Sequence, residues 1–304
     1  MIILNQMNFK KKFTIEKNIY FFEIKKDVTK KVADFYNSKP FPNYKNLDDK
    51  SSILNLGNNN FIARKFKEFI GFDKEILEVG TGTGQLSNYL AIGTNNRIFA
   101  LDPTIKSIEL GSDFALKNNI PNVSFINGDI FDDIFANSAF DHIWCSGVLH
   151  HTKEPYKAFQ ILIKSLKTNG YVVLGLYNKF GRFRTFVRQF FFKFFGYSFV
   201  KFFDPILRND VITDKDKIES WVNDQYRHPV ESSHTIDEVL SWFNDNNIDF
   251  INSIPECDFH TNPDIFKKKS KGNFVGRIIR QVFMIFTPVG ADGGLFIMIG
   301  KKIK

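Results

Sequence analysis

Three acidic side chains in the first half of the chain lie where short apolar runs end. Glu78 precedes a glycine-rich turn, and Asp102 and Asp129 close the next two runs. If these runs are parallel strands, their carboxyl ends lie at one edge of a sheet, where open α/β sheets bind ligands. A carboxylate there can attract an ammonium group or accept hydrogen bonds from hydroxyl and amino groups. The pattern therefore indicates a ligand-binding edge.

The turn after Glu78 has glycine at positions 80, 82 and 84 and opens a helix predicted at 85–91. Glycine lets backbone approach a ligand closely, and a helix N-terminus adds polar N–H groups. The spacing differs from the GxGxxG of dinucleotide sites, and an acid before the turn would repel a pyrophosphate. It would instead attract the ammonium of a methionine moiety. A tight turn without a ligand is the competing interpretation.

The other two acids have similar pairs of interpretations. Asp102 is placed to accept both hydroxyls of a ribose, or else it caps the helix that follows Pro103. Asp129 is placed to accept from an adenine amino group while Ile130 packs on the ring, or else it is a turn residue. Taken together, three acids at successive strand ends favour binding.

Strands alternate with amphipathic helices along most of the chain, which predicts parallel βαβ units and a doubly wound sheet. A hairpin is expected within the first 25 residues. Helices are predicted at 60–70, 85–91, 154–167 and 235–246, the last capped by Thr235. Strands are predicted at 75–79, 97–101, 123–127, 140–145, 171–176, 249–254 and 295–300.

The segment 78–84, Asp102, Gly128-Asp129 and the run from Ser146 to His151 resemble the class I S-adenosylmethionine-dependent methyltransferases, over about 76–177. The resemblance implies a Rossmann-like doubly wound α/β fold with a seven-stranded sheet whose last strand is antiparallel. It also implies S-adenosylmethionine as the methyl donor. The donor-binding residues would be Glu78, Gly80, Thr81, Gly82, Gly84, Asp102, Pro103, Gly128, Asp129, Ile130 and Ser146.

Methyl transfer requires an aligned acceptor and the exclusion of water, and it needs a general base only if the acceptor arrives protonated. His150 and His151 are the candidates for that base because both follow the fourth strand of the predicted sheet, and His151 is the preferred one. The alternative is that one of them only holds the loop. Acceptor-binding candidates are Tyr177, Asn178, Tyr226 and His228, whereas His142 is expected to be structural.

Two insertions follow strands and are therefore expected at the carboxyl edge. We divide the chain into an N-terminal extension (1–59), a donor-binding half (60–178), a helical lid (179–233) and a final part (234–304) with a basic insertion near 255–288. In both insertions basic residues outnumber acidic ones, and phenylalanines recur at near-helical spacing in the first. Either the phenylalanines pack on the domain and the charges are solvated, or the lid binds an anionic or amphiphilic acceptor at a membrane surface.

The composition gives weaker constraints. The chain has 304 residues, a formal charge of +8 and two cysteines, with no spacing typical of a zinc site. No metal, nucleic acid or membrane span is expected, and the cytoplasm is the expected location. The predicted function is methyl transfer to a small-molecule or lipid-like, anionic acceptor. The alternatives are a non-catalytic methyltransferase-like binding protein, an RNA methyltransferase and an NAD-dependent oxidoreductase. The acceptor and the oligomeric state are not predicted.

Overall fold

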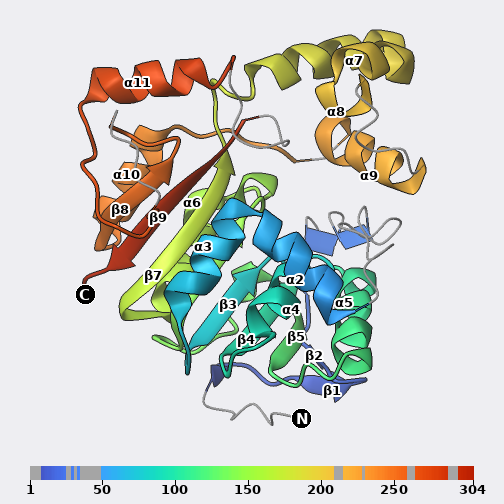
Figure 1. The fold of residues 1–304 in the computed structure, drawn as a ribbon, viewed down its shortest axis with the longest axis vertical. Coiled ribbons are helices and arrows are strands. Elements are labelled where there is room, and N and C mark those ends of the chain that lie inside the picture. Colours follow the sequence, from blue (N-terminus) through green and yellow to red (C-terminus); the bar gives the residue numbers. More distant parts are fainter. Residues whose placement is uncertain are drawn as a thin grey trace.

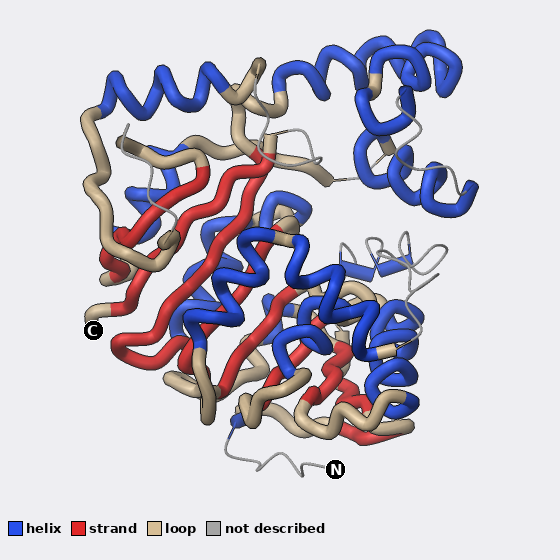
Figure 2. Tube along the Cα trace, viewed as in Figure 1, coloured by secondary structure: helices blue, strands red, loops and turns tan. Residues whose placement is uncertain are grey.

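The computed structural model describes residues 8–24, 29–30, 33–34, 49–208, 215–227, 230–258, 264–286 and 294–304. Its centre is one mixed sheet with the strand order β1-β2-β5-β4-β3-β6-β7-β9-β8 (Figures 1 and 2). Helices cover both faces of this sheet. The Rossmann-like α/β fold predicted from the sequence is therefore confirmed.

Five parallel strands form the middle of the sheet. Most of their residues are buried, as expected for strands that helices cover on both faces. The strands run so that their carboxyl ends share one edge. Their bounds are Glu75–Val79 (β3), Arg97–Asp102 (β4), Val123–Asn127 (β5), Phe140–Ser146 (β6) and Leu166–Tyr177 (β7).

The last two strands lie at one side of the sheet. β9 (Leu295–Lys302) runs antiparallel to β7 and to β8 (Ile248–Ile254). The antiparallel last strand agrees with the expectation from the family resemblance.

The prediction of seven strands is wrong, because a hairpin adds two strands at the opposite side. β1 (Thr14–Glu16) and β2 (Ile19–Phe21) pair antiparallel, and β2 then pairs parallel with β5. Both residues between them, Lys17 and Asn18, have positive φ, as a two-residue hairpin turn of type I′ requires. Three-residue strands carry too little periodicity to show in the sequence that they join the main sheet.

Each face of the sheet has its own apolar core. One core contains side chains of four helices, α2 (Lys50–Asn59), α3 (Phe61–Ile70), α4 (Gln85–Ala91) and α5 (Ile105–Lys117). The other contains side chains of α6 (Pro155–Ser165) and α10 (Ile236–Asp245). Thr235 caps α10 by accepting from the N–H of Glu238 at 3.1 Å, as predicted. These helices fix the strand ends on which the site depends.

The segment after β7 is helical, as predicted, and comprises α7 (Phe183–Phe203), α8 (Pro205–Arg208) and α9 (Lys215–Tyr226). It has a small core of its own, formed by Val200, Leu207, Trp221, Val222 and Tyr226. The second insertion contains α11 (Phe274–Phe283). Figure 1 shows α7 and α11 along the same end of the molecule. The phenylalanines of α7 are mostly exposed rather than packed on the domain, and its role as a lid stays a prediction.

Candidate active site

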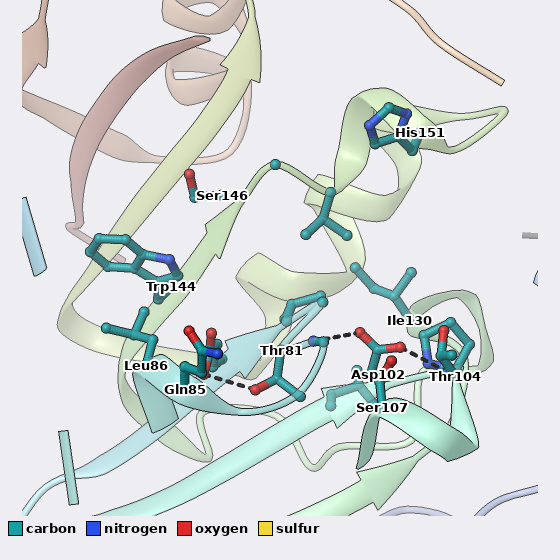
Figure 3. Close-up of a pocket in the computed structure, with 18 of the residues that line it drawn as sticks. Thr81, Gln85, Leu86, Asp102, Thr104, Ser107, Ile130, Trp144, Ser146 and His151 are labelled. Atoms are coloured by element: carbon teal, nitrogen blue, oxygen red, sulfur yellow. Dashed lines mark hydrogen bonds between the residues drawn. The ribbon is translucent and has the colours of Figure 1, made fainter. Parts of the chain in front are cut away.

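A cavity of about 600 Å³ lies at the carboxyl ends of the parallel strands. Figure 3 shows its strand-end residues, with Asp102 beside the turn that contains Thr81, and Ser146 and Trp144 on the neighbouring strand. All predicted donor-binding residues line this cavity except Gly84. The structure thus brings together the three acids that are far apart in the sequence.

Glu78 is 6% exposed and lies at the floor of the glycine turn. Its Oε2 accepts hydrogen bonds from the hydroxyls of Thr81, at 2.9 Å, and of Ser87. Burial raises the pKa of Glu78 to about 7, although these two hydroxyls act in the opposite direction. A carboxyl with this pKa is poised to ionise when a positive group enters, because a nearby cation favours its charged form.

Asp102 combines the two roles between which its position in the sequence left a choice. Its Oδ2 accepts from the N–H of Gly82 and its Oδ1 from the N–H of Thr104, both at 2.8 Å (Figure 3). It therefore ties the glycine turn to the start of α5. An ionised carboxylate has about four lone-pair sites, so these two bonds leave acceptor capacity toward the cavity that Asp102 lines. Burial raises the pKa of this carboxyl as well.

Asp129 is 2% exposed and also lines the cavity. Its Oδ1 accepts from the N–H of Phe131 at 2.9 Å, and its Oδ2 accepts from the hydroxyl of Thr29 at 2.5 Å. The N-terminal extension thus reaches the cavity through Thr29, which also lines it. Ile130 lies beside Asp129 on the wall, and its contact with an adenine ring stays a prediction.

Two of the turn glycines are required by close packing. A Cβ on Gly80 would lie 2.2 Å from a methyl group of Val148, and one on Gly84 would lie 2.6 Å from the ring of Phe125. Both glycines have positive φ, which other residues rarely adopt. Gly84 therefore supports the turn from behind, whereas Gly82 faces the cavity.

The two adjacent histidines differ in position. His151 lines the cavity, and its Nδ1 lies 3.0 Å from the carbonyl oxygen of Val230. A carbonyl can only accept, so Nδ1 is the protonated nitrogen and the lone pair of the neutral ring is on Nε2. His150 is fully buried and packs against Tyr177 in a tilted arrangement, with ring centroids 3.9 Å apart. His151 thus lines the cavity and His150 does not, and the role of His151 as a base stays a prediction.

Tyr177 lies between the cavity and a buried polar cluster. Its ring is covered by His150 and, at 3.8 Å, by the guanidinium of Arg182. Arg182 is fully buried and forms a two-pronged ion pair with Glu231, at 3.0 and 2.7 Å. Gln225 of α9 joins Arg182 to the Tyr177 hydroxyl. This cluster fixes the helical segment on the carboxyl end of β7.

The structure does not place the other acceptor candidates in the cavity lining. Asn178 is fully buried and structural, since its amide bonds to Gln281 and its oxygen accepts from two backbone N–H groups. Tyr226 donates to Asp204 at 2.5 Å inside the small helical core. His228 lies outside the described residues. His142 packs among Phe66, Phe69 and Tyr171, as a structural residue would, and burial lowers its pKa to about 4.

Sequence reasoning missed several apolar residues of the wall, namely Ile53, Leu56, Leu86, Trp144 and Trp221. Ile53 and Leu56 belong to α2, which no motif marked. α2 comes close to α4, since a Cβ on Gly57 would lie 2.2 Å from the Tyr89 ring. Trp144 was predictable, because alternation along a strand puts it on the same side as Ser146.

Residues 71–191 match the model of a methyltransferase domain. They form a class I S-adenosylmethionine-dependent methyltransferase domain. The match covers the glycine turn, all three acids and both adjacent histidines. The methyl donor predicted for the domain, S-adenosylmethionine, is confirmed with it.

Curated relatives share only this part of the chain. The mitochondrial ubiquinone biosynthesis O-methyltransferase of Schizosaccharomyces pombe is 30% identical over 135 residues, which are 42% of this chain and 48% of that protein. The uncharacterized methyltransferase YcgJ of Bacillus subtilis is 28% identical over 102 residues, 34% of this chain and 40% of that protein. The chain thus spans less than half the length of these relatives.

Solved structures share the fold at low sequence identity. The structure of PKMT2 from Rickettsia typhi with AdoHcy has a TM-score of 0.56 at 16% identity, covering 80% of this chain and 52% of that one. A Haloferax volcanii methyltransferase in complex with the activator Trm112 has a TM-score of 0.51 at 12% identity, covering 93% and 100%. These likenesses support the fold of the methyltransferase domain.

Within the described ranges, no helix of this protein is both long enough and apolar enough to cross a membrane. α7 is the longest of these helices. Lys193 and Lys201 interrupt its apolar sequence, and Gly196 breaks its helical geometry with a non-helical φ.

Proposed function

We propose that this protein transfers a methyl group from S-adenosylmethionine to a small-molecule or lipid-like, anionic acceptor. The observation that carries the proposal is that Glu78, Asp102 and Asp129 line one cavity at the carboxyl edge of the sheet. When bound there, the donor would supply a methyl carbon activated by a positively charged sulfur.

The residues of the cavity fit this donor in chemistry and in space. The three carboxyls suit an ammonium, a pair of ribose hydroxyls and an adenine amino group, taken in the order of Glu78, Asp102 and Asp129. Gly82 offers backbone without a side chain on the cavity wall. Ile130 and Phe131 supply apolar surface beside Asp129 for an aromatic ring.

The acceptor would bind toward the other end of the cavity, between the strand ends and the helical segment. Tyr177 and Trp221 provide an aromatic wall there. His151 would hold Nδ1–H toward the Val230 carbonyl and take the acceptor proton on Nε2. Exclusion of water and alignment of the acceptor would supply most of the acceleration.

The test incubates the full chain with S-adenosylmethionine labelled in the methyl group, and with lipid and small-molecule fractions separately. We expect label in an organic-extractable product. His151→Gln should lower kcat by roughly 10²- to 10⁴-fold with donor affinity unchanged. The matched variant His150→Gln, outside the cavity lining, should lower stability more than turnover.

Two results would change the proposal. Full turnover by His151→Gln would remove the assigned base and leave alignment alone. Donor binding with no labelled product in any fraction would favour a methyltransferase-like protein that does not catalyse.

A further inference from the structure

Two helices at the carboxyl end of the sheet bury polar side chains against the protein and expose apolar ones. In α11 the polar side chains face the domain: Gln281 is fully buried, and its Oε1 accepts from the side chain of Asn178 and from the N–H of Ile236, both at 2.9 Å. One turn earlier, Arg277 pairs with Asp237 at 2.5 Å. Polar contacts, rather than apolar packing, therefore hold much of this helix to the protein.

The opposite face of α11 is apolar and exposed. Its side chains follow helical spacing and continue just past the end of the helix, at Val275, Ile279, Val282 and Phe286. Val275 is 63% exposed and Phe286 is 70% exposed. A surface helix normally packs its apolar face on the core of the protein. We therefore expect a lipid surface or another molecule to cover this exposed face.

The first half of α7 likewise buries polar side chains and exposes apolar ones. Arg182, at its N-cap, and Thr185 are fully buried, and the Gln189 side chain donates to the carbonyl of Gln225 at 2.8 Å. Exposed phenylalanines lie on the outer side, at positions 183, 186, 190 and 194. The two helices meet near Gly181, where a Cβ would lie 3.2 Å from the Cβ of Met284. We call these eight exposed side chains of α7 and α11 the outer ridge.

Charge decides what fits the outer ridge. Exposed basic residues accompany it at Arg184, Lys193, Lys201 and Lys271. The only acidic residue between 179 and 208 is Asp204, which is buried, and 265–286 contains none. A second copy would bring the same basic surface against itself, and like charges repel. An anionic lipid surface suits both the exposed apolar side chains and the basic charge of the ridge. The apolar side chains would enter the acyl boundary, and the lysines and arginines would stay at the headgroups.

We propose that the outer ridge docks this protein on an anionic membrane surface without crossing it. The ridge follows β7 and precedes β9, and Tyr177 and Leu295 at those strand ends line the cavity. Docking therefore sets the acceptor side of the cavity next to the lipid. This surface is independent of methyl transfer, and the two proposals fail separately.

The test is cosedimentation of the full chain with vesicles of phosphatidylcholine alone and of phosphatidylcholine with added phosphatidylglycerol. We expect binding to the anionic vesicles that weakens with salt. Phe190→Ser with Phe194→Ser, or Val275→Ser with Ile279→Ser, should lower the partition coefficient roughly tenfold or more. Lys193→Gln with Lys201→Gln should lower it roughly fivefold for each charge removed.

A control distinguishes binding through the ridge from nonspecific adsorption of the protein to vesicles. Phe72→Ser removes a phenylalanine that is 62% exposed, before β3 at the opposite edge of the sheet, and it should not change binding. Gly82→Arg, aimed at the donor site, should also bind vesicles like the wild type. Far-ultraviolet circular dichroism and S-adenosylhomocysteine binding check that the ridge variants fold.

Three outcomes would overturn the proposal. These are no vesicle binding by the wild type, equal binding to neutral and anionic vesicles, and equal losses in the ridge variants and Phe72→Ser. If the wild type ignores vesicles but self-associates in sedimentation, and Phe190→Ser with Phe194→Ser abolishes the association, the ridge is a protein interface instead.

Discussion

The donor edge of the cavity and the outer ridge distribute polar and apolar groups in opposite ways. At the donor edge, Glu78, Asp102 and Asp129 are nearly buried, and each accepts hydrogen bonds from the protein. Along the ridge, apolar side chains are exposed and polar ones such as Gln281 face inward. Burying a polar group costs free energy unless it is hydrogen-bonded, and these three acids and Gln281 are all hydrogen-bonded.

The difference shows which contacts each region uses for stability. The donor edge is supported by the apolar cores on both faces of the sheet, so we expect it to keep its geometry without a bound partner. The ridge is attached by a few buried polar contacts, chiefly Arg182 with Glu231 and Gln281 with Asn178. Losing one such contact should therefore loosen the ridge while the sheet stays folded.

The largest expected effect is at Arg182. Arg182→Met leaves Glu231 without its partner in a mostly buried position, and breaking a buried pair typically costs about 3–5 kcal/mol. Urea unfolding should show this loss as a lower midpoint or as an early separate transition of the helices. Arg184→Met is the matched control on the exposed side and should stay within about 0.5 kcal/mol of the wild type. Equal effects of the two variants would show that the helices are not held by the polar cluster.

The next effect is on the donor edge. Gly82→Arg should weaken S-adenosylhomocysteine binding by more than roughly 100-fold, or about 2.7 kcal/mol, because a long side chain would fill the cavity that Gly82 lines. Gly93→Arg makes the same change at another glycine with positive φ, where an added Cβ meets open space. Titration calorimetry on both variants separates blockage from backbone strain. Comparable binding losses would point to strain alone.

A smaller effect depends on pH. Burial raises the pKa of Glu78 to about 7 from an ordinary value of 4.5. Binding of an ammonium favours the ionised carboxyl, so donor affinity should rise roughly tenfold per pH unit below 7 and level off above it. The effect on stability has the opposite sign. Between about pH 4.5 and 7 the folded protein binds a proton at Glu78 that the unfolded chain has lost, so the contribution of Glu78 to the free energy of unfolding falls as the pH rises through this range.

Calorimetry between pH 5.5 and 8 with Glu78→Gln checks both trends. The variant should bind weakly and nearly independently of pH, since glutamine does not titrate. A wild-type affinity that is flat across this range would show that Glu78 does not face the ammonium.

The smallest expected effect is at the start of α11. Asn273 caps this helix by accepting from the N–H of Gly276 at 2.7 Å. Asn273→Ala should cost about 1 kcal/mol and increase hydrogen exchange in α11, whereas Asn273→Asp should keep the cap. If α11 were held mainly by its outer apolar face, the loss of the cap would leave its exchange unchanged.

The sequence predicted the parallel part of the fold well because its signals there are local. The bounds of β3 and β5 and the Thr235 cap follow from apolar runs and from capping chemistry. Ten of the eleven donor-binding candidates line the cavity because each adjoins a strand end. Gly84 is the exception, because the spacing of a motif does not say which glycine lines the cavity.

The rest depends on contacts between distant segments. Periodicity identified an apolar face on α7 but not whether that face points inward, which the burial of Thr185 and the Arg182–Glu231 pair decide. Asn178 looked like a site residue because it ends β7, yet its partner Gln281 lies 103 positions away. No local pattern indicates such a partner, and none marked Thr29 as a contact of Asp129.

The most direct test of the central claim is titration calorimetry of the wild-type chain with S-adenosylhomocysteine and, separately, with NADH. The account predicts saturable binding of one S-adenosylhomocysteine per chain and no binding of NADH, because the acid at the glycine turn suits an ammonium and repels a pyrophosphate. No binding of S-adenosylhomocysteine by folded protein, or binding of NADH in its place, would contradict it.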